Sequence, residues 1–299
     1  DFTGSELSGN KIRKLEFLLA EAKSSGADTV ITCGGAQSNH CRATALAAAR
    51  CGLQSLLLLR TPDPNDPPDI EGNILLDKLA GAEIVWVTPE EYQNRQRSFE
   101  FETERLTNQG NKPYIIPEGG SNALGCWGYV MAIKEIGSDL KAQGIDDFDS
   151  TTVLSATGSG GTTAGLTLGN KIFDFGFNVV GVNVCEDAPH FVREISKITE
   201  NFLKSYPVSI DISKDDINIM DGYVGEGYAL AGRKQLEEMY KLAQLEGIIL
   251  DPVYTGKAFF GMMSELKKNS AAFRKRIVFI HTGGHFGLFP IAKQLETLF

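Results

Sequence analysis

Two segments of the chain carry residue types that suit covalent and phosphate-binding chemistry. Lys11 lies in the run Ser8–Glu16, and a lysine amine can form an imine with an aldehyde. Far downstream, the run Thr157–Gly165 is rich in glycine and hydroxyl residues. Glycines let backbone N–H groups converge on a phosphate. An imine-forming lysine and a phosphate-binding turn are what pyridoxal phosphate requires, so the pair predicts this cofactor.

The surroundings of Lys11 suit an amine that must lose its proton near neutral pH. The ordinary pKa of lysine is about 10.4, so burial or a nearby cation has to lower it. Arg13 and Lys14 are close in sequence, and Lys14 is one helical turn from Lys11. A solvent-exposed basic helix face is the competing interpretation of this motif when it is taken alone.

The glycine-rich turn follows an apolar run and precedes a helix expected from about Thr163. The positive end of a helix dipole would face a phosphate there, and Ser159 and Thr162 could add hydrogen bonds. A tight turn without a ligand is the alternative. A dinucleotide site is disfavoured because Thr163 stands where the third glycine is expected. A nucleotide P-loop is disfavoured because the turn does not end in lysine.

A second turn, Gly34–His40, is expected to lie between a strand and a helix. Ser38 or Asn39 can cap the helix, and Gln37 can contribute its amide, so the turn could bind a carboxylate. Simple capping explains the turn equally well. His40 by itself is expected to be a packed helix histidine.

Two further turns lie in the C-terminal third, Asp251–Lys257 and Ile280–His285. Tyr254 could stack on an aromatic cofactor. Thr282 follows a predicted strand, at the sheet edge where ligands usually bind. A core tyrosine and a turn threonine explain these two residues equally well in isolation.

Composition excludes several classes of protein. The chain of 299 residues has a net charge of −9 and no basic stretch, which argues against nucleic acid as the main partner. The five cysteines are scattered, so we expect a reducing compartment and no structural zinc. Glycines separate His281 from His285, so we predict no metal site at these two histidines. No apolar run reaches the roughly 18 residues of a membrane span. The start Asp1–Gly4 is neither a signal peptide nor an initiator methionine, so we expect residues upstream of it.

Short apolar runs alternate with helical segments along the chain, which predicts a doubly wound α/β fold. The predicted strands are Thr29–Cys33, Ser55–Leu59, Glu83–Val87, Tyr114–Ile116, Thr152–Ala156, Val179–Val184 and Ile277–Ile280. The predicted helices are Lys11–Lys23, capped by Asn10, Ser38–Arg50, one from about Ala123, and one that includes Leu236, Met239, Tyr240 and Ala243.

The turn Pro117–Asn122 precedes a long helix, and we predict the domain change there. Residues 14–122 would form a small α/β domain, and residues 1–13 with 123–299 a large cofactor-binding domain. The loop Thr61–Asp69 is expected to be a surface excursion. Residues 186–223 show no clear pattern and receive no element; a subunit contact or a lid is expected there.

Five segments together resemble the family of D-cysteine desulfhydrases and 1-aminocyclopropane-1-carboxylate (ACC) deaminases. They are Ser8–Glu16, Gly34–His40, Thr157–Thr162, Asp251–Lys257 and His281–Gly284. The resemblance spans nearly the whole chain. It implies the tryptophan-synthase-β architecture, fold type II of the pyridoxal phosphate enzymes, with two open, mostly parallel sheets. It also implies a homodimer and a further N-terminal segment.

The resemblance assigns roles to individual residues. Lys11 would bind the cofactor aldehyde, Tyr254 would stack on the pyridine ring, and Thr282 would face the ring nitrogen. The phosphate would be bound by Gly158, Ser159, Gly160, Gly161 and Thr162, with Lys14. Gln37, Ser38 and Asn39 would meet the substrate carboxylate, and Asn39 also the cofactor. The catalytic residues would be Lys11, Ser38 and Tyr254.

Two positions separate the branches of this family. In ACC deaminases a glutamate follows the stacking tyrosine and a leucine precedes the glycine pair, whereas this chain has Thr255 and Thr282. A carboxylate stabilises a protonated ring nitrogen and a strong electron sink, which opening a carbon ring demands. A threonine hydroxyl supports a weaker sink, which suffices for β-elimination. The two threonines therefore favour β-elimination, and the resemblance implies D-cysteine as the substrate, with pyruvate, hydrogen sulfide and ammonia as products.

Other functions stay open at this point. Within the family, the alternatives are ACC deamination and elimination from another β-substituted alanine, such as L-cysteate or a chlorinated alanine. A binding protein without catalysis is disfavoured by the intact Lys11. An NAD-dependent dehydrogenase is disfavoured because an acidic residue is missing about 20 positions after the glycine turn. We expect a cytoplasmic protein, or one of an organelle matrix if a targeting segment was removed.

Overall fold

The computed structural model describes residues 5–268 and 271–299, so the start Asp1–Gly4 lies outside the described residues. The chain divides into two compact units. The smaller unit contains residues 5–120 and Phe286–Ile291, and the larger unit contains Ser121–His285 and Ala292–Phe299. The division at Gly120 lies inside the turn Pro117–Asn122. The sequence-based domain limits, 14–122 against 1–13 with 123–299, stay a prediction.

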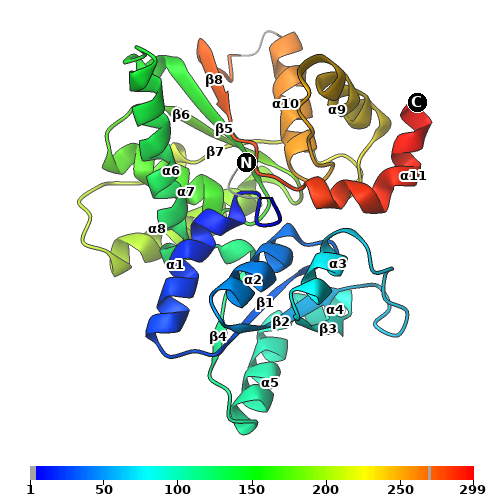
Figure 1. The fold of residues 1–299 in the computed structure, drawn as a ribbon. Helices are drawn as coiled ribbons and strands as arrows, with labels where there is room; N and C mark the ends of the chain where they lie inside the picture. Colours follow the sequence, from blue (N-terminus) through cyan, green and yellow to red (C-terminus); the bar gives the residue numbers. More distant parts are fainter. Residues whose placement is uncertain (1–4, 269–270) are drawn as a thin grey trace. The chain divides into compact units, whose positions relative to one another are not determined.

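The smaller unit contains one parallel sheet of four strands in the order β3-β2-β1-β4 (Figure 1). Its strands are β1 (Thr29–Gly35), β2 (Gln54–Arg60), β3 (Glu83–Val87) and β4 (Pro113–Ile115). Its helices are α1 (Lys11–Ser24), α2 (Asn39–Arg50), α3 (Gly72–Leu79), α4 (Pro89–Gln93) and α5 (Arg95–Asn108).

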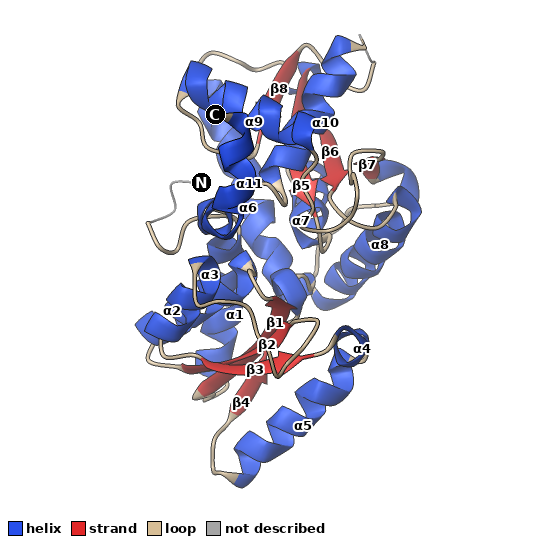
Figure 2. Ribbon diagram, turned by 90° about the vertical axis from the view of Figure 1, so that its right-hand side faces the viewer, coloured by secondary structure: helices blue, strands red, loops and turns tan. Residues whose placement is uncertain are grey.

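Helices cover both faces of this sheet. Leu57 and Leu59 of β2 pack with Cys41 and Ala45 of α2 on one face. Leu56 and Leu58 of β2 point to the opposite face. There they pack against Tyr92 of α4 and against Phe99 and Leu106 of α5. Figure 2 shows α1, α2 and α3 on one side of the sheet and α5 on the other. Burial on both faces explains the apolar run Leu56–Leu59 of the central strand β2.

The larger unit contains a second parallel sheet of four strands, in the order β7-β6-β5-β8. Its strands are β5 (Thr151–Thr157), β6 (Asn178–Asn183), β7 (Asn218–Met220) and β8 (Arg276–Phe279). Its helices are α6 (Ala123–Ala142), α7 (Gly161–Ile172), α8 (Ala188–Ser205), α9 (Arg233–Glu246), α10 (Thr255–Lys267) and α11 (Ala292–Leu295).

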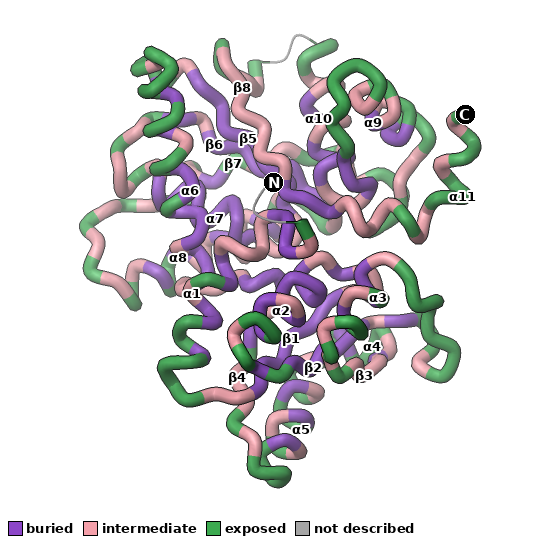
Figure 3. The backbone as a smooth tube through the Cα atoms, viewed as in Figure 1, coloured by how far each residue is buried: buried purple, intermediate pink, exposed green. Residues whose placement is uncertain are grey.

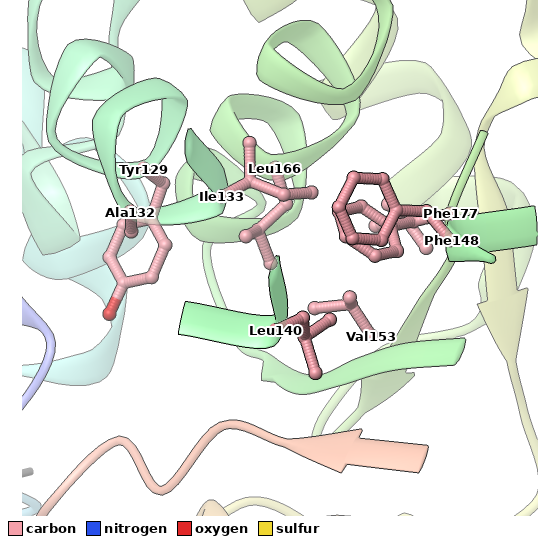
Figure 4. Close-up of a cluster of buried hydrophobic side chains, with 9 residues drawn as sticks. Tyr129, Ala132, Ile133, Leu140, Phe148, Val153, Leu166 and Phe177 are labelled. Carbon is pink, nitrogen blue, oxygen red and sulfur yellow. The ribbon is translucent and has the colours of Figure 1, made fainter. Parts of the chain in front are cut away.

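Two apolar clusters lie on the two faces of this second sheet. Val153 and Val179 pack with residues of α6 and α7, including Ile133 and Leu166, in the cluster drawn in Figure 4. On the other face the strand residues pack against α10, and the members are Leu154, Ala156, Val180, Val182, Val184, Ala258 and Met262. Figure 3 shows β5 and β6 among the most buried parts of the chain.

The predicted fold class is confirmed, because both sheets are parallel and helices flank them. Three local expectations were wrong or incomplete. Asn10 occupies the position before α1, but its side chain makes no capping hydrogen bond to that helix. Helix α7 begins at Gly161, two residues before the expected Thr163. The unassigned residues 186–223 contain α8 and β7.

In the described part of the chain, no helix is both long and apolar enough to cross a lipid bilayer.

Candidate active site

Lys11 is the first residue of α1, and the backbone just before it is held by a buried guanidinium. Arg42 of α2 donates from Nη2 to the Ser8 carbonyl (3.1 Å) and from Nη1 to the Glu6 carbonyl. Gly9 adopts the left-handed conformation, with φ of 105°, which favours glycine. These contacts fix the direction in which the chain enters α1 at Lys11.

Asn73 of α3 connects Arg42 with the turn that precedes α2. Its Oδ1 atom accepts from Arg42 Nε (3.1 Å), and its Nδ2 group donates to Asn39 Oδ1 (3.1 Å) and the Gln37 carbonyl (3.0 Å). The Asn73 backbone N–H donates to Gln37 Oε1 (2.8 Å). One fully buried amide therefore orients two of the predicted substrate-binding residues.

Burial shifts the pKa values of Arg42 and of Asp77, which lie close to this hydrogen-bond network. Desolvation lowers the pKa of Arg42 to about 10, against the attraction of Asp77. Desolvation also raises the pKa of Asp77 to about 8, against the attraction of Arg42. Neither carboxyl oxygen of Asp77 has a hydrogen-bond partner among the described residues. Burial therefore favours the uncharged carboxyl of Asp77, and Arg42 donates three hydrogen bonds to other partners.

Of the two predicted caps, Ser38 and Asn39, Ser38 caps α2, since its Oγ atom accepts from the Cys41 backbone N–H (3.2 Å). A Cβ atom on Gly34 would lie 2.3 Å from Ser38 Oγ, so only glycine lets the end of β1 approach this hydroxyl so closely. The predicted residues Ser38 and Asn39 therefore stand at the positive end of the α2 dipole, which favours a carboxylate.

His40 is a packed, neutral histidine, as expected. The Thr32 hydroxyl donates to the Ile116 carbonyl (2.8 Å), so it accepts from His40 Nε2 (2.8 Å), and Nε2 carries the proton. Burial lowers the pKa of His40 far below its ordinary value, and the charges of Lys11 and Lys14 act in the same direction. Lys14 is itself buried and donates from Nζ to the Gly119 carbonyl (3.1 Å). Its predicted phosphate contact stays a prediction.

In the larger unit, the glycine turn joins β5 directly to α7. Gly160 has a φ of 82° and is the residue before the helix. The Gly161 N–H donates to Ser121 Oγ (3.2 Å), which also shares a hydrogen bond with Ser159 Oγ (2.8 Å). A Cβ atom on Gly161 would lie 2.5 Å from Ser121 Oγ and 2.8 Å from Ser121 Cα. The turn therefore has the form of an anion site at a helix N-terminus.

Tyr254 packs against this turn. A Cβ atom on Gly158 would lie 2.8 Å from Cε1 of the Tyr254 ring. The Tyr254 hydroxyl shares a hydrogen bond with the Tyr228 hydroxyl (2.7 Å), and the two ring centroids are 6.1 Å apart. The predicted stacking residue thus lies beside the predicted phosphate turn, with a second tyrosine that the sequence did not single out.

The turn that carries Tyr254 is organised by Asp251. Its carboxylate accepts from the backbone N–H groups of Tyr254 (2.9 Å) and Thr255 (2.7 Å). The Thr255 hydroxyl lies 2.6 Å from Asp251 Oδ1 and 2.8 Å from the Asp251 backbone nitrogen, and Thr255 is fully buried.

Thr282 lies after the end of β8. Because β5, β6 and β8 are parallel, the glycine turn, Val184 and Thr282 all follow strand ends at one edge of the sheet.

His281 and His285 both direct Nε2 at the Ile249 carbonyl, at 2.7 and 3.0 Å. The Gly283 N–H donates to His281 Nδ1 (3.1 Å). Among residues 5–268 and 271–299, no three His, Cys, Asp or Glu side chains form a group that could hold a metal ion.

The family model described as "Pyridoxal-phosphate dependent enzyme" matches residues 3–283 of the chain. A bifunctional D-cysteine desulfhydrase/ACC deaminase, mitochondrial, of Arabidopsis thaliana is 42% identical over 303 residues, covering 100% of this chain and 74% of that protein. The chain belongs to the D-cysteine desulfhydrase and ACC deaminase family of pyridoxal phosphate enzymes.

Two other family members are similarly close. A D-cysteine desulfhydrase of Yersinia pestis is 37% identical over 297 residues, covering 99% of this chain and 88% of that protein. A crystal structure described as an ACC deaminase homologue superposes with a TM-score of 0.88 at 36% identity, covering 100% of this chain and 87% of the other. The predicted family, fold type II and pyridoxal-phosphate-dependent lyase chemistry are thus confirmed.

The residues present fit the family's cofactor, pyridoxal phosphate. The α7 turn has no room for a Cβ atom at Gly158 or Gly161, and it leads straight into a helix N-terminus. An aromatic ring, Tyr254, lies against the same turn. A phosphate and an attached aromatic ring match these two features.

Four residues that shape the predicted binding turns of the two units were missed in the sequence. Arg42 and Asn73 looked like ordinary helix residues, and only their burial distinguishes them. Ser121 lies in the turn Pro117–Asn122, which we interpreted only as a domain boundary. A serine beside two glycines could also have indicated a binding turn. Tyr228 lies in a segment of irregular structure, and its sequence gave no indication of a hydroxyl partner.

Proposed function

We propose that this enzyme converts D-cysteine to pyruvate, hydrogen sulfide and ammonia by α,β-elimination, with one water consumed. Pyridoxal phosphate, when bound, draws electrons from Cα of an amino acid and so allows a β-substituent to leave. Lys11 Nζ would hold the cofactor aldehyde and would take the Cα proton of the substrate as general base.

The other predicted residues bind and orient. Gly158, Ser159, Gly160, Gly161 and Thr162 bind the phosphate with Lys14, and Asn39 and Thr282 contact the ring. Ser38 binds the substrate carboxylate at the start of α2, with Gln37 and Asn39 held by Asn73. Tyr254 stacks on the ring and assists proton handling, and its hydroxyl shares a hydrogen bond with the Tyr228 hydroxyl. Assembly as a homodimer and a cytoplasmic location stay predictions.

The observation that carries the choice of reaction is threonine at both branch positions. Thr255 is fully buried, and its hydroxyl is engaged by Asp251. Thr282 can offer a ring nitrogen only a neutral hydrogen bond. A ring nitrogen without an acid beside it gives a weaker electron sink, which is sufficient when thiolate leaves.

ACC deamination is the second candidate. The 42%-identical relative of Arabidopsis thaliana carries both activities in its name. Elimination from L-cysteate or a chlorinated alanine is the further alternative within this chemistry.

Side-by-side assays distinguish these reactions. The purified enzyme is given D-cysteine, L-cysteine, ACC, L-cysteate or 3-chloro-D-alanine, and sulfide, 2-oxo acid and ammonia are measured. We expect sulfide and pyruvate in equal amounts from D-cysteine, with kcat/KM at least about 10-fold above that for ACC, since tenfold corresponds to only about 1.4 kcal/mol of selectivity. Free pyridoxal phosphate without enzyme is the control. Faster turnover of ACC than of D-cysteine would identify a deaminase instead.

A further inference from the structure

Lys257, a lysine that takes no part in the proposed cofactor chemistry, has a buried side chain. Lys257 of α10 is fully buried, and its Nζ atom donates to three backbone carbonyls. They belong to Val184 (3.2 Å), Val224 (2.7 Å) and Gly227 (2.5 Å). A neutral amine has only two N–H groups, so three acceptors require the ammonium form.

The three carbonyls come from two chain segments that adjoin the proposed active site. Val184 follows β6, and its N–H donates to the Thr157 carbonyl (3.1 Å), just before the glycine turn. Val224 and Gly227 lie in residues 221–232, where the structure has neither helix nor strand. Gly227 directly precedes Tyr228, the hydrogen-bond partner of Tyr254. The ammonium therefore connects the sheet edge, α10 and the backbone beside Tyr228.

Packing alone does not explain a cation at this position. Burial lowers the pKa of Lys257, while the nearby Cys185 and Asp251 act in the opposite direction. An apolar side chain of similar volume would avoid the desolvation of a charge and often stabilises a protein core. Three convergent carbonyl oxygens, in contrast, are the ligand set that a monovalent cation accepts in place of water.

We propose that Lys257 is a built-in monovalent cation that positions Tyr228 against Tyr254, and that its three-carbonyl site binds a free cation when the lysine is removed. Lys257 is thus a positioning residue, and this role rests on the proposed function of Tyr254. The site itself, formed by Val184, Val224 and Gly227, is independent of which substrate the enzyme uses.

The test compares Lys257→Ala, which leaves room for an ion, with Lys257→Met, which fills the space. Each holoenzyme is assayed in chloride salts of choline, potassium and ammonium at equal ionic strength. In choline, we expect Lys257→Ala to lose kcat for D-cysteine by about 10- to 100-fold, with a smaller change in KM, as loss of one oriented contact does. Ammonium or potassium should restore kcat at least about 10-fold in Lys257→Ala but not in Lys257→Met.

Two further readouts separate positioning from general stability. The thermal midpoint of Lys257→Ala should rise with ammonium but not with choline, which tests the cation site even if D-cysteine is not the substrate. In a Tyr228→Phe background, Lys257→Ala should cost less than about 3-fold in kcat, because the two residues act through one contact. Lys267→Ala, an exposed change on the same helix, is the matched control.

The outcomes decide the proposal. Unchanged kcat of Lys257→Ala in choline would overturn it, as would a loss of kcat and stability that neither small cation restores. If Lys257→Ala does not fold in choline, its soluble yield is compared after refolding with ammonium. Recovery with ammonium supports the cation site, and equal failure in every salt overturns it.

Discussion

Replacing Lys11 by alanine is expected to abolish the visible absorption of the purified enzyme and to lower kcat/KM for D-cysteine by about 10³-fold or more. The amine at position 11 would both bind the cofactor aldehyde and take the Cα proton, and a positioned general base alone contributes about 10²- to 10⁴-fold. The measurement is an absorption spectrum together with sulfide release at saturating cofactor.

Lys23→Ala is the matched control, because Lys23 lies on the same helix and is exposed. Its spectrum and turnover should equal those of the wild type. A Lys11→Ala enzyme that retains the visible band of the wild type would show that another amine binds the cofactor. A retained band would therefore contradict the proposed role of Lys11.

Replacing Gly161 by alanine is expected to weaken pyridoxal phosphate binding by about 10²- to 10³-fold. The new Cβ atom would lie 2.5 Å from Ser121 Oγ and 2.8 Å from Ser121 Cα, so the start of α7 would have to move. Loss of one or two charge-assisted hydrogen bonds to a phosphate, each about 1.5–3 kcal/mol, gives a change of this size. Cofactor-free protein is titrated with pyridoxal phosphate, and binding is followed by fluorescence.

Gly232→Ala is the control for this glycine. It precedes α9, has a φ of −74°, and a Cβ atom there would meet nothing within 4 Å. We expect its affinity for pyridoxal phosphate to match that of the wild type. Wild-type affinity in Gly161→Ala as well would mean that the α7 turn does not bind the phosphate.

Much of the fold follows from local sequence patterns. Glu83–Val87 was predicted with its observed limits, because the apolar run Ile84–Val87 marks it even though this edge strand is only partly buried. Helix α8 was missed although its signal was present: Phe191, Ile195, Thr199 and Phe202 are buried at helical spacing after the cap Asp187. Strand β7 has three residues, too few for any periodicity.

The site was predictable only where function shapes a contiguous motif. Ser38 and Asn39 could be named as the two candidate caps because capping depends on the next few residues, and Ser38 is the cap. Arg42 could not be assigned, since its partner Ser8 is 34 positions away and the contact depends on how α2 packs. Lys257 was part of a recognised motif, yet its three carbonyl partners come from segments at least 30 positions away in sequence.

The covalent attachment at Lys11 is tested most directly by reducing the purified enzyme with borohydride, which fixes the cofactor to the amine that holds it. The protein is then digested, and the modified peptide is sequenced by mass spectrometry. We predict that the phosphopyridoxyl group is found on Lys11. Its recovery on any other lysine, such as Lys14 or Lys257, would contradict the assignment on which the proposed elimination depends.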